Sequence, residues 1–127
     1  MKKLFGSIYI PLAWTILIEI LFCLPGSTIP DTGSMFTIPN LDKIVHIIIF
    51  GTFVGLWCFY FSKKSFTNQK LKLVFFYVFL IAAFNGIAIE FIQKYFIPNR
   101  SFDQGDIIAD LLSAGIAYGI CNVKLLV

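Results

Sequence analysis

The sequence predicts an all-α fold, an integral membrane bundle of four transmembrane helices with both termini in the cytoplasm. Of the 127 residues, 58% are hydrophobic and only 13% are charged, which leaves too few polar residues to cover a soluble domain of this size. Four apolar stretches are long enough to cross a hydrocarbon core of ~30 Å, which takes about 20 helical residues. The charged residues lie at the ends of these stretches, with the acids on one side and most bases on the other.

We expect the four spans near residues 4–24, 41–61, 71–96 and 106–122. They use most of the chain, so residues 1–127 are predicted to form a single membrane domain. The runs are continuously apolar, whereas a β-barrel would alternate lipid-facing and lumen-facing residues over short segments. The amino-terminal run is longer than a typical secretory signal core and no small-x-small cleavage pattern follows it, so we interpret it as an uncleaved anchor.

Several residues predict where the helices bend, begin and end. Pro11 lies inside the first expected span and predicts a kink, and Leu24-Pro25-Gly26 predicts a sharp end. Asn40 precedes the second span and can cap its amino end. Ser101 is followed three residues later by Gln104, the spacing of a capping box, which predicts that the last helix starts nearby.

Pairs of small residues four positions apart occur on the last three spans. They are Gly51 and Gly55, Ala82 and Gly86, and Gly115 and Gly119. Inside lipid, such residues let helix backbones approach closely. We therefore expect the last three spans to form the tight core of the bundle, with the first span packed alongside.

The distribution of Lys and Arg predicts the orientation. Seven of the ten bases share one side with no acid: Lys2, Lys3, Lys63, Lys64, Lys70, Lys72 and Lys124. The opposite side carries the other three bases and all seven acids, a formal balance of −4. By the positive-inside rule, the basic side with both termini faces the cytoplasm and the acidic side faces outward.

A polar stripe runs along each of the last three spans near the acidic side. The stripes are Asp42, His46 and Phe50; Gly86, Glu90 and Gln93; and Asp106, Asp110, Ser113 and Ala117. Their helical period predicts that each faces the bundle interior. Glu90 lies roughly 10 Å below the interface at ~1.5 Å per residue, a depth at which a carboxylate pairs, is protonated or lines a wet cavity. We predict a functional cluster of His46, Glu90 and Asp110.

The residues predicted to bind a ligand around this cluster are Asp42, Lys43, Gln93, Arg100, Asp103 and Asp106. Several have alternative interpretations. The three aspartates could simply favour the positive amino ends of their helices. Lys43 is interpreted as a snorkelling residue, and Arg100 as either an interfacial anchor or the receptor for an anion.

The predicted cluster has the groups needed for acid–base chemistry. A desolvated carboxyl beside an imidazole can serve as general acid and base, and two carboxylates sharing a proton could do the same; a purely structural hydrogen bond is the alternative. A divalent metal could bind the carboxylates and one imidazole, but no paired-ligand motif is present, so neither a metal nor another cofactor is predicted. No nucleophile elbow, phosphate-cradling glycine loop or nucleic-acid surface is recognisable in the sequence.

The ordered polar residues resemble the VanZ-like family. The pattern consists of Leu24-Pro25-Gly26, Asp42-Lys43-x-x-His46-x-x-x-Phe50-Gly51, Glu90-x-x-Gln93 and Arg100-x-x-Asp103-x-x-Asp106-x-x-x-Asp110-x-x-x-x-Gly115. The resemblance runs from about Leu24 to Gly115. Asp110 departs from the family pattern, which more often has Asn there, and the extra acid could change the protonation of the site.

The resemblance implies a role at the bacterial cell envelope, because the family takes its name from a membrane protein linked to low-level teicoplanin resistance. We expect a multi-pass protein of the bacterial cytoplasmic membrane that binds or processes an amphiphilic or lipid-linked envelope molecule. The alternatives are a membrane-embedded acid/base enzyme and a small proton-coupled transporter, which would need at least a dimer. Expected partners are membrane lipids, a lipid-linked or lipoglycopeptide ligand and a second copy of the chain, but no nucleic acid.

Overall fold

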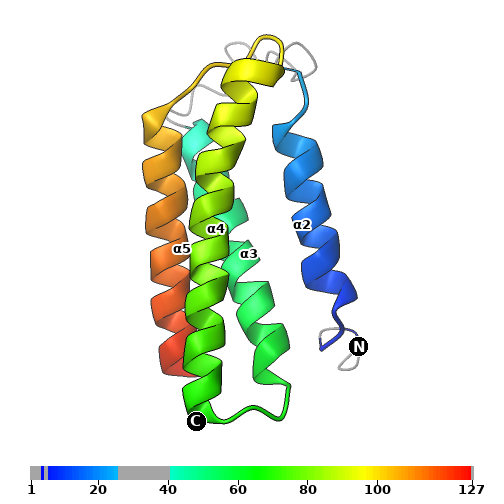
Figure 1. Cartoon of the computed structure of the whole chain (residues 1–127), viewed down its shortest axis with the longest axis vertical. Coiled ribbons are helices and arrows are strands. Elements are labelled where there is room, and N and C mark those ends of the chain that lie inside the picture. The colour runs from blue at the N-terminus through cyan, green and yellow to red at the C-terminus, as the bar shows by residue number, and fades with distance from the viewer. Residues whose placement is uncertain (1–3, 5, 26–40, 127) are drawn as a thin grey trace.

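The computed structural model describes residues 4, 6–25 and 41–126 and contains four helices in this part of the chain. They are α2 (Tyr9–Phe22), α3 (Leu41–Ser62), α4 (Asn68–Phe96) and α5 (Gln104–Lys124). The helices run alongside one another as an elongated bundle (Figure 1). No strand occurs among the described residues, and the all-α prediction is confirmed.

Three of the helices are long and apolar enough to cross a membrane, as judged by length and composition. These are α3, α4 and α5, with 22, 29 and 21 residues. Large apolar side chains cover their outward faces; Phe84 and Phe96 are 74% and 78% exposed. Helix α2 is also apolar but has 14 residues, about 21 Å at 1.5 Å per residue, less than the ~30 Å of a hydrocarbon core. An apolar outer surface on long helices is that of a membrane protein.

Helix α2 is shorter than expected at its amino end. The sequence predicts a helix from residue 4, but α2 begins at Tyr9. Pro11 therefore lies in the first turn, where its missing N–H removes no helical hydrogen bond. At this position a proline gives no reason for the expected kink. The Thr15 hydroxyl donates to the Pro11 carbonyl oxygen at 2.8 Å.

The amino ends of the last two helices depend on side-chain caps. Helix α4 starts at Asn68, earlier than expected, because the Thr67 hydroxyl accepts a hydrogen bond from the Lys70 N–H. Helix α5 is capped by Asp103, whose carboxylate accepts from the Gly105 N–H at 2.7 Å. The capping residue predicted from the sequence, Ser101, is therefore wrong, and the cap lies two residues later. The cap predicted at Asn40 lies outside the described residues.

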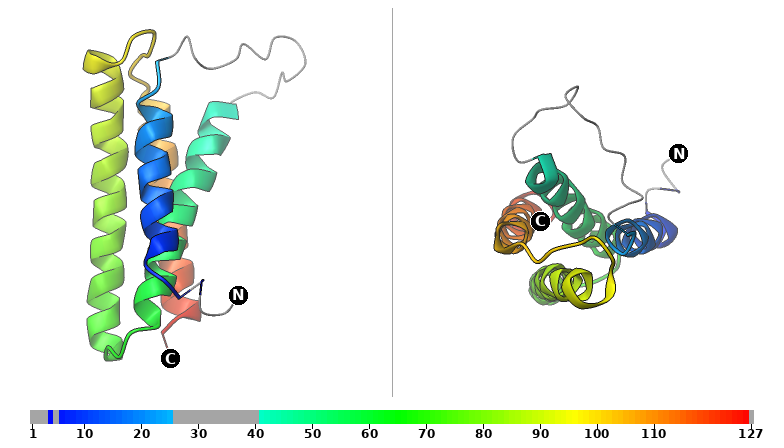
Figure 2. Two further views of the ribbon diagram at one scale, coloured as in Figure 1. Left: turned by 90° about the vertical axis from the view of Figure 1, so that its right-hand side faces the viewer. Right: turned by 90° about the horizontal axis from the view of Figure 1, so that it is seen from above.

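Helices α3, α4 and α5 pack mainly against one another, and α2 lies alongside with fewer contacts, as predicted. Seen from above, α2 stands at the edge of the group, next to α3 (Figure 2). Aromatic rings fill part of the interior, since Phe50 and Phe75 are fully buried. The abundant Phe residues are thus not only lipid-facing.

The small residues contribute unequally to this packing. A Cβ atom placed on Gly86 would lie 2.8 Å from Asp110 Oδ2, so α4 approaches α5 closely at this point. At Gly51 the nearest atoms, those of Ser113, would be 3.9 Å away, and at Gly55 and Gly119 nothing lies within 4 Å. The predicted close approach is therefore correct for Gly86 and wrong for Gly55 and Gly119.

Helix α2 is attached to the other helices by hydrogen bonds as well as by apolar packing. The Trp14 indole N–H donates to the Ile49 carbonyl at 3.1 Å. The Asn85 amide on α4 donates to Glu19 Oε1 at 2.7 Å. Asn85 thus provides a polar partner for Glu19, a carboxylate on an otherwise apolar helix.

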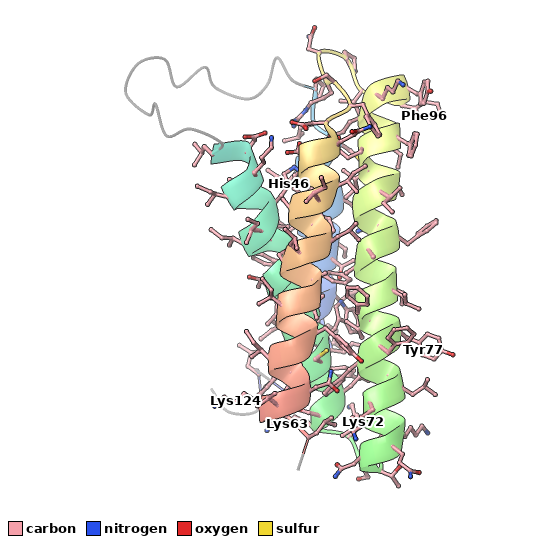
Figure 3. The ribbon with its side chains drawn as sticks, turned by 90° about the vertical axis from the view of Figure 1, so that its left-hand side faces the viewer. His46, Lys63, Lys72, Tyr77, Phe96 and Lys124 are labelled. Atoms are coloured by element: carbon pink, nitrogen blue, oxygen red, sulfur yellow. The ribbon has the colours of Figure 1, made fainter. Side chains whose placement is uncertain are left out.

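The two ends of the bundle differ in charge. Lys63, Lys72 and Lys124 gather at one end, and His46 lies near the other (Figure 3). The start of α2, the α3–α4 connection and the end of α5 all lie at the lysine end (Figure 1). The segregation of charge along the chain is thus a segregation between the ends of the bundle.

Replacing Gly86 by Ala is expected to destabilise the protein, because the new methyl group would collide with an aspartate that is itself held in place. Overpacking of this kind typically costs about 1–3 kcal/mol, more than the ~1 kcal/mol gained from the helix propensity of Ala. Gly55→Ala is the matched control, since it makes the same change in open space and should leave the stability unchanged or raise it. Thermal unfolding in detergent measures both, and equal melting temperatures would contradict the tight contact.

Candidate functional site

The predicted cluster lies inside the bundle at the acidic end and combines side chains from three helices. His46 on α3 and Asp110 on α5 form a direct pair, with 2.8 Å between His46 Nδ1 and Asp110 Oδ1. Both are buried, at 5% and 1% exposed. The structure therefore brings together the imidazole and the carboxyl that the sequence placed on neighbouring helices at similar depth.

The second nitrogen of the imidazole lies near another carboxylate, and Glu90 lies close to both residues. His46 Nε2 lies 3.5 Å from Asp106 Oδ2. His46, Glu90 and Asp106 each offer one ligand atom, and these three atoms all lie within 4.8 Å of one another. Glu90 is fully buried, and its Oε2 accepts a hydrogen bond from the Asp103 backbone N–H at 3.0 Å. Asp106, predicted only as a ligand-binding residue around the cluster, lies next to His46 and Glu90.

Lys43 forms ion pairs with the aspartates at the mouth of the site. Its ammonium nitrogen lies 2.9 Å from Asp103 Oδ2, 3.2 Å from Asp42 Oδ2 and 3.5 Å from Asp106 Oδ1. Interpreting Lys43 as an ordinary snorkelling residue is therefore incomplete, because the side chain turns toward the carboxylates of α5. The pairing links the start of α3 to the start of α5.

Asp103 connects the helix cap to the cluster. Its side chain caps α5 and accepts from Lys43, while its backbone N–H donates to Glu90. The Lys43 ammonium, and after it the Gly105 N–H, hold the pKa of the Asp103 carboxyl below its ordinary value. The alternative role at a helix amino end is correct for Asp103, and the same residue also orients Glu90.

Gln93 and Arg100 reach the carboxyl end of α2. The Gln93 amide donates to the Phe22 carbonyl at 2.9 Å, and the Arg100 Nε–H donates to the Leu24 carbonyl at 3.2 Å. The last carbonyls of a helix lack partners within it. The Gln93 bond satisfies one of them, and the Arg100 bond holds the chain just after α2. Gln93, expected above the cluster, is buried; Arg100 is more exposed and remains at the mouth.

A cavity of about 540 Å³ opens at this end of the bundle. Its polar lining includes Asp42, His46, Gln93, Asn99, Arg100, Ser101, Asp103 and Asp106. Its apolar lining consists of Leu21, Phe22, Leu41 and Val45. The lining of the cavity therefore combines apolar side chains with charged groups of both signs.

Aromatic rings position the imidazole. The Phe22 ring centroid lies 4.5 Å from that of His46, and the Phe50 ring is nearly parallel to His46 at 6.3 Å. These contacts and the bond to Asp110 restrict the orientation of the ring. The sequence placed Phe50 on the stripe of His46, but nothing in it indicated Phe22, which arrives from α2.

Three carboxylate oxygens in the cluster are buried without a hydrogen bond from any described residue. They are Glu90 Oε1, Asp106 Oδ1 and Asp110 Oδ2. Asp106 Oδ1 has the long contact of 3.5 Å to Lys43, which is electrostatic rather than a hydrogen bond. A buried carboxylate oxygen without a hydrogen bond is unusual in a protein and requires an explanation.

Comparison with known proteins gives one family and one curated relative. A family model described as VanZ/LLP1 matches residues 3–126, nearly the whole chain. An uncharacterised protein of Schizosaccharomyces pombe, C11E3.10, is 32% identical over 82 residues, covering 63% of this chain. The match spans less than half, 46%, of that relative's own length. No solved structure matches significantly.

Asp103→Asn is expected to separate the ion pair with Lys43 from the cap, because Asn still accepts from the Gly105 N–H. A carboxylate with a depressed folded pKa stabilises the protein above its unfolded pKa, about 3.9 for Asp, and this contribution is lost as the pH falls through the folded value. The variant should therefore melt below the wild type at neutral pH, and the gap should close below about pH 3.9.

Melting curves of both proteins in detergent from neutral to acid pH measure this gap. In a Lys43→Met background the same Asp103→Asn change should have little effect at any pH. A gap that stays constant with pH would show that the pair does not stabilise the fold.

Proposed function

Since the chain belongs to the VanZ/LLP1 family, we propose that it is a membrane protein of the cell envelope whose acidic cavity binds the head group of an amphiphilic, lipid-linked molecule. The observation that carries the proposal is the mixed lining of the cavity. Apolar side chains of α2 and of the start of α3 line it together with Asp, His and Arg side chains. This arrangement suits a ligand with a hydrocarbon part beside a polar head.

In the proposed binding mode, the apolar and the polar lining residues contact different parts of the ligand. Leu21 and Val45 contact the hydrocarbon part, and Arg100 meets an anionic group at the mouth. His46 lies deeper and holds or exchanges a proton with the head group. Handling of lipid-linked or lipopeptide material is the way in which such a cavity would influence susceptibility to teicoplanin-type antibiotics.

We further propose that all four helices span the membrane as a single domain, with both termini in the cytoplasm. The lysine end contains the start of α2, the α3–α4 connection and the end of α5, and the positive-inside rule places such an end in the cytoplasm. Helix α2 lies beside α3 and presents exposed apolar residues such as Leu12, Ile16 and Ile20. A bacterial cytoplasmic membrane is the location proposed, although C11E3.10 comes from a fungus.

A second candidate function is acid–base catalysis on the same class of lipid-linked substrate. It is favoured by the His46–Asp110 pair, in which a buried carboxylate orients an imidazole beside a further carboxyl, Glu90. Such a pairing is how proteins hold a histidine for proton transfer. Binding and catalysis use the same cavity but predict different products.

The topology predicts the activity of reporter fusions. Alkaline phosphatase, which is active only outside the cytoplasm, should be inactive when fused after Lys124 or between residues 63 and 66. It should be active when fused between residues 98 and 102, and green fluorescent protein should show the opposite pattern. Phosphatase activity at the lysine end would reverse the orientation and place the cavity in the cytoplasm.

Loss of the cluster is expected to abolish the envelope phenotype. The wild type, His46→Ala, Glu90→Gln and the control Glu19→Gln are expressed in a bacterial host at matched membrane levels, and teicoplanin susceptibility is measured. We expect the wild type and the control to protect, and the two cluster variants to resemble empty vector. If the wild type also resembles empty vector, the resistance role is wrong.

Mass spectrometry of envelope lipids from the same strains separates the two candidate functions. A species that changes with the wild type but not with His46→Ala supports catalysis. Protection that depends on His46 while the lipids stay unchanged supports binding.

A further inference from the structure

We propose that His46, Glu90 and Asp106 bind one divalent transition-metal cation of the Zn²⁺ or Mn²⁺ type. Their ligand atoms all lie within 4.8 Å of one another. Ligands that each stand about 2.0–2.2 Å from one ion lie at most about 4.4 Å apart, so small side-chain adjustments suffice. An imidazole nitrogen with two carboxylate oxygens is a donor set that such cations accept. The three ligands come from α3, α4 and α5, which is why the spacing along the sequence gives no motif.

Glu90 supplies an independent reason to expect a cation. Its side chain is fully buried, and Oε1 has no hydrogen-bond partner among the described residues. Oε2 is already bonded to the Asp103 N–H, so the carboxylate is oriented while one oxygen is left over. A buried, oriented and unsatisfied carboxylate oxygen is a natural metal ligand.

The hydrogen bonding of the imidazole is also that of a metal ligand. Histidines that bind metals typically donate their other ring N–H to a carboxylate, which sets the tautomer and the ring orientation. Asp110 occupies this position, 2.8 Å from Nδ1. Nε2 is then the nitrogen free to bind an ion, and it lies 3.5 Å from Asp106 Oδ2. Phe22 and Phe50 restrict the ring further.

The charges around the site favour a divalent ion. Glu90, Asp106 and Asp110 place three carboxylates in a buried volume, and Lys43 is the described cation nearest to Asp106. A divalent ion offsets two of these three negative charges without protonating any of the carboxylates. The other trio of potential ligands, Asp42, Asp103 and Asp106, is a weaker candidate because two of its members are already paired with Lys43 at 3.2 Å or less.

The site leaves room for a further ligand. Two of the three proposed ligands, His46 and Asp106, line the cavity, so a coordination position left by the three protein donors can be reached from the cavity. Water or an oxygen of a bound head group would fill it. The metal site goes beyond the proposed function and does not depend on it, since the ion binds whether or not a lipid enters.

The test is metal binding by the purified full chain in detergent after treatment with a chelator. Co²⁺ is the probe, because its visible absorption reports the coordination sphere, and Zn²⁺ content is measured by mass spectrometry. We expect one ion per chain for the wild type. His46→Ala and Glu90→Gln should bind at least about tenfold more weakly. Glu19→Gln makes the same change in a carboxylate bonded to Asn85 and should bind as the wild type does.

Asp110 variants test the positioning role. Asp110→Asn keeps an acceptor for the His46 N–H and should retain Co²⁺ binding, whereas Asp110→Ala should weaken it about 10–100-fold. Bound Zn²⁺ should also raise the melting temperature of the wild type and not that of Glu90→Gln. If Glu90→Gln does not fold, Glu90→Asp, which shortens the ligand, should shift the Co²⁺ spectrum. A wild type without stoichiometric binding, or variants that all bind equally, would overturn the proposal.

Discussion

Burial of ionisable groups at one end of an apolar bundle is the constraint on which the rest of the structure depends. Glu90 and Asp110 are almost completely inaccessible, and a lone carboxylate in such surroundings is unfavourable unless it is paired, hydrogen-bonded or neutralised. The neighbours meet this need in part: His46 pairs with Asp110, and the Asp103 N–H with Glu90. The helices must therefore keep their depth relative to one another, because a slide along the axis would separate the partners.

The composition of the spans and the depth of their polar residues made the main features predictable. A helical period places Glu90 and Gln93 on one face of α4, and that face is buried because its polar groups cannot face lipid. The same reasoning placed His46 and Asp110 at a similar depth, and in the structure the two side chains are in contact. Both predictions need only the helical period and the depth of each residue in its span, and a single sequence provides these.

Features that depend on a neighbouring segment could not be read in this way. Lys43 reaches Asp103 across 60 positions of sequence, so its snorkelling pattern looked ordinary. Asp103 rather than Ser101 became the cap because the chain before α5 also bonds to Glu90. Gly55 matched the small-residue spacing of Gly86 but faces open space, since spacing does not say which side of a helix a partner occupies.

Helix α2 shows how a weakly packed element can complete a site. It makes fewer contacts than the other helices, yet the Phe22 ring packs against His46 at a tilt and lines the cavity. Gln93 bonds to the Phe22 carbonyl at the end of α2, and Arg100 bonds to the Leu24 carbonyl just after it, so polar bonds help to fix this part of the cavity lining. In lipid, where apolar surface gains little from helix–helix contact, such bonds are what can hold it. The position of Phe22, which lines the cavity and packs against the imidazole of His46, thus depends on the hydrogen bonds from Gln93 and Arg100.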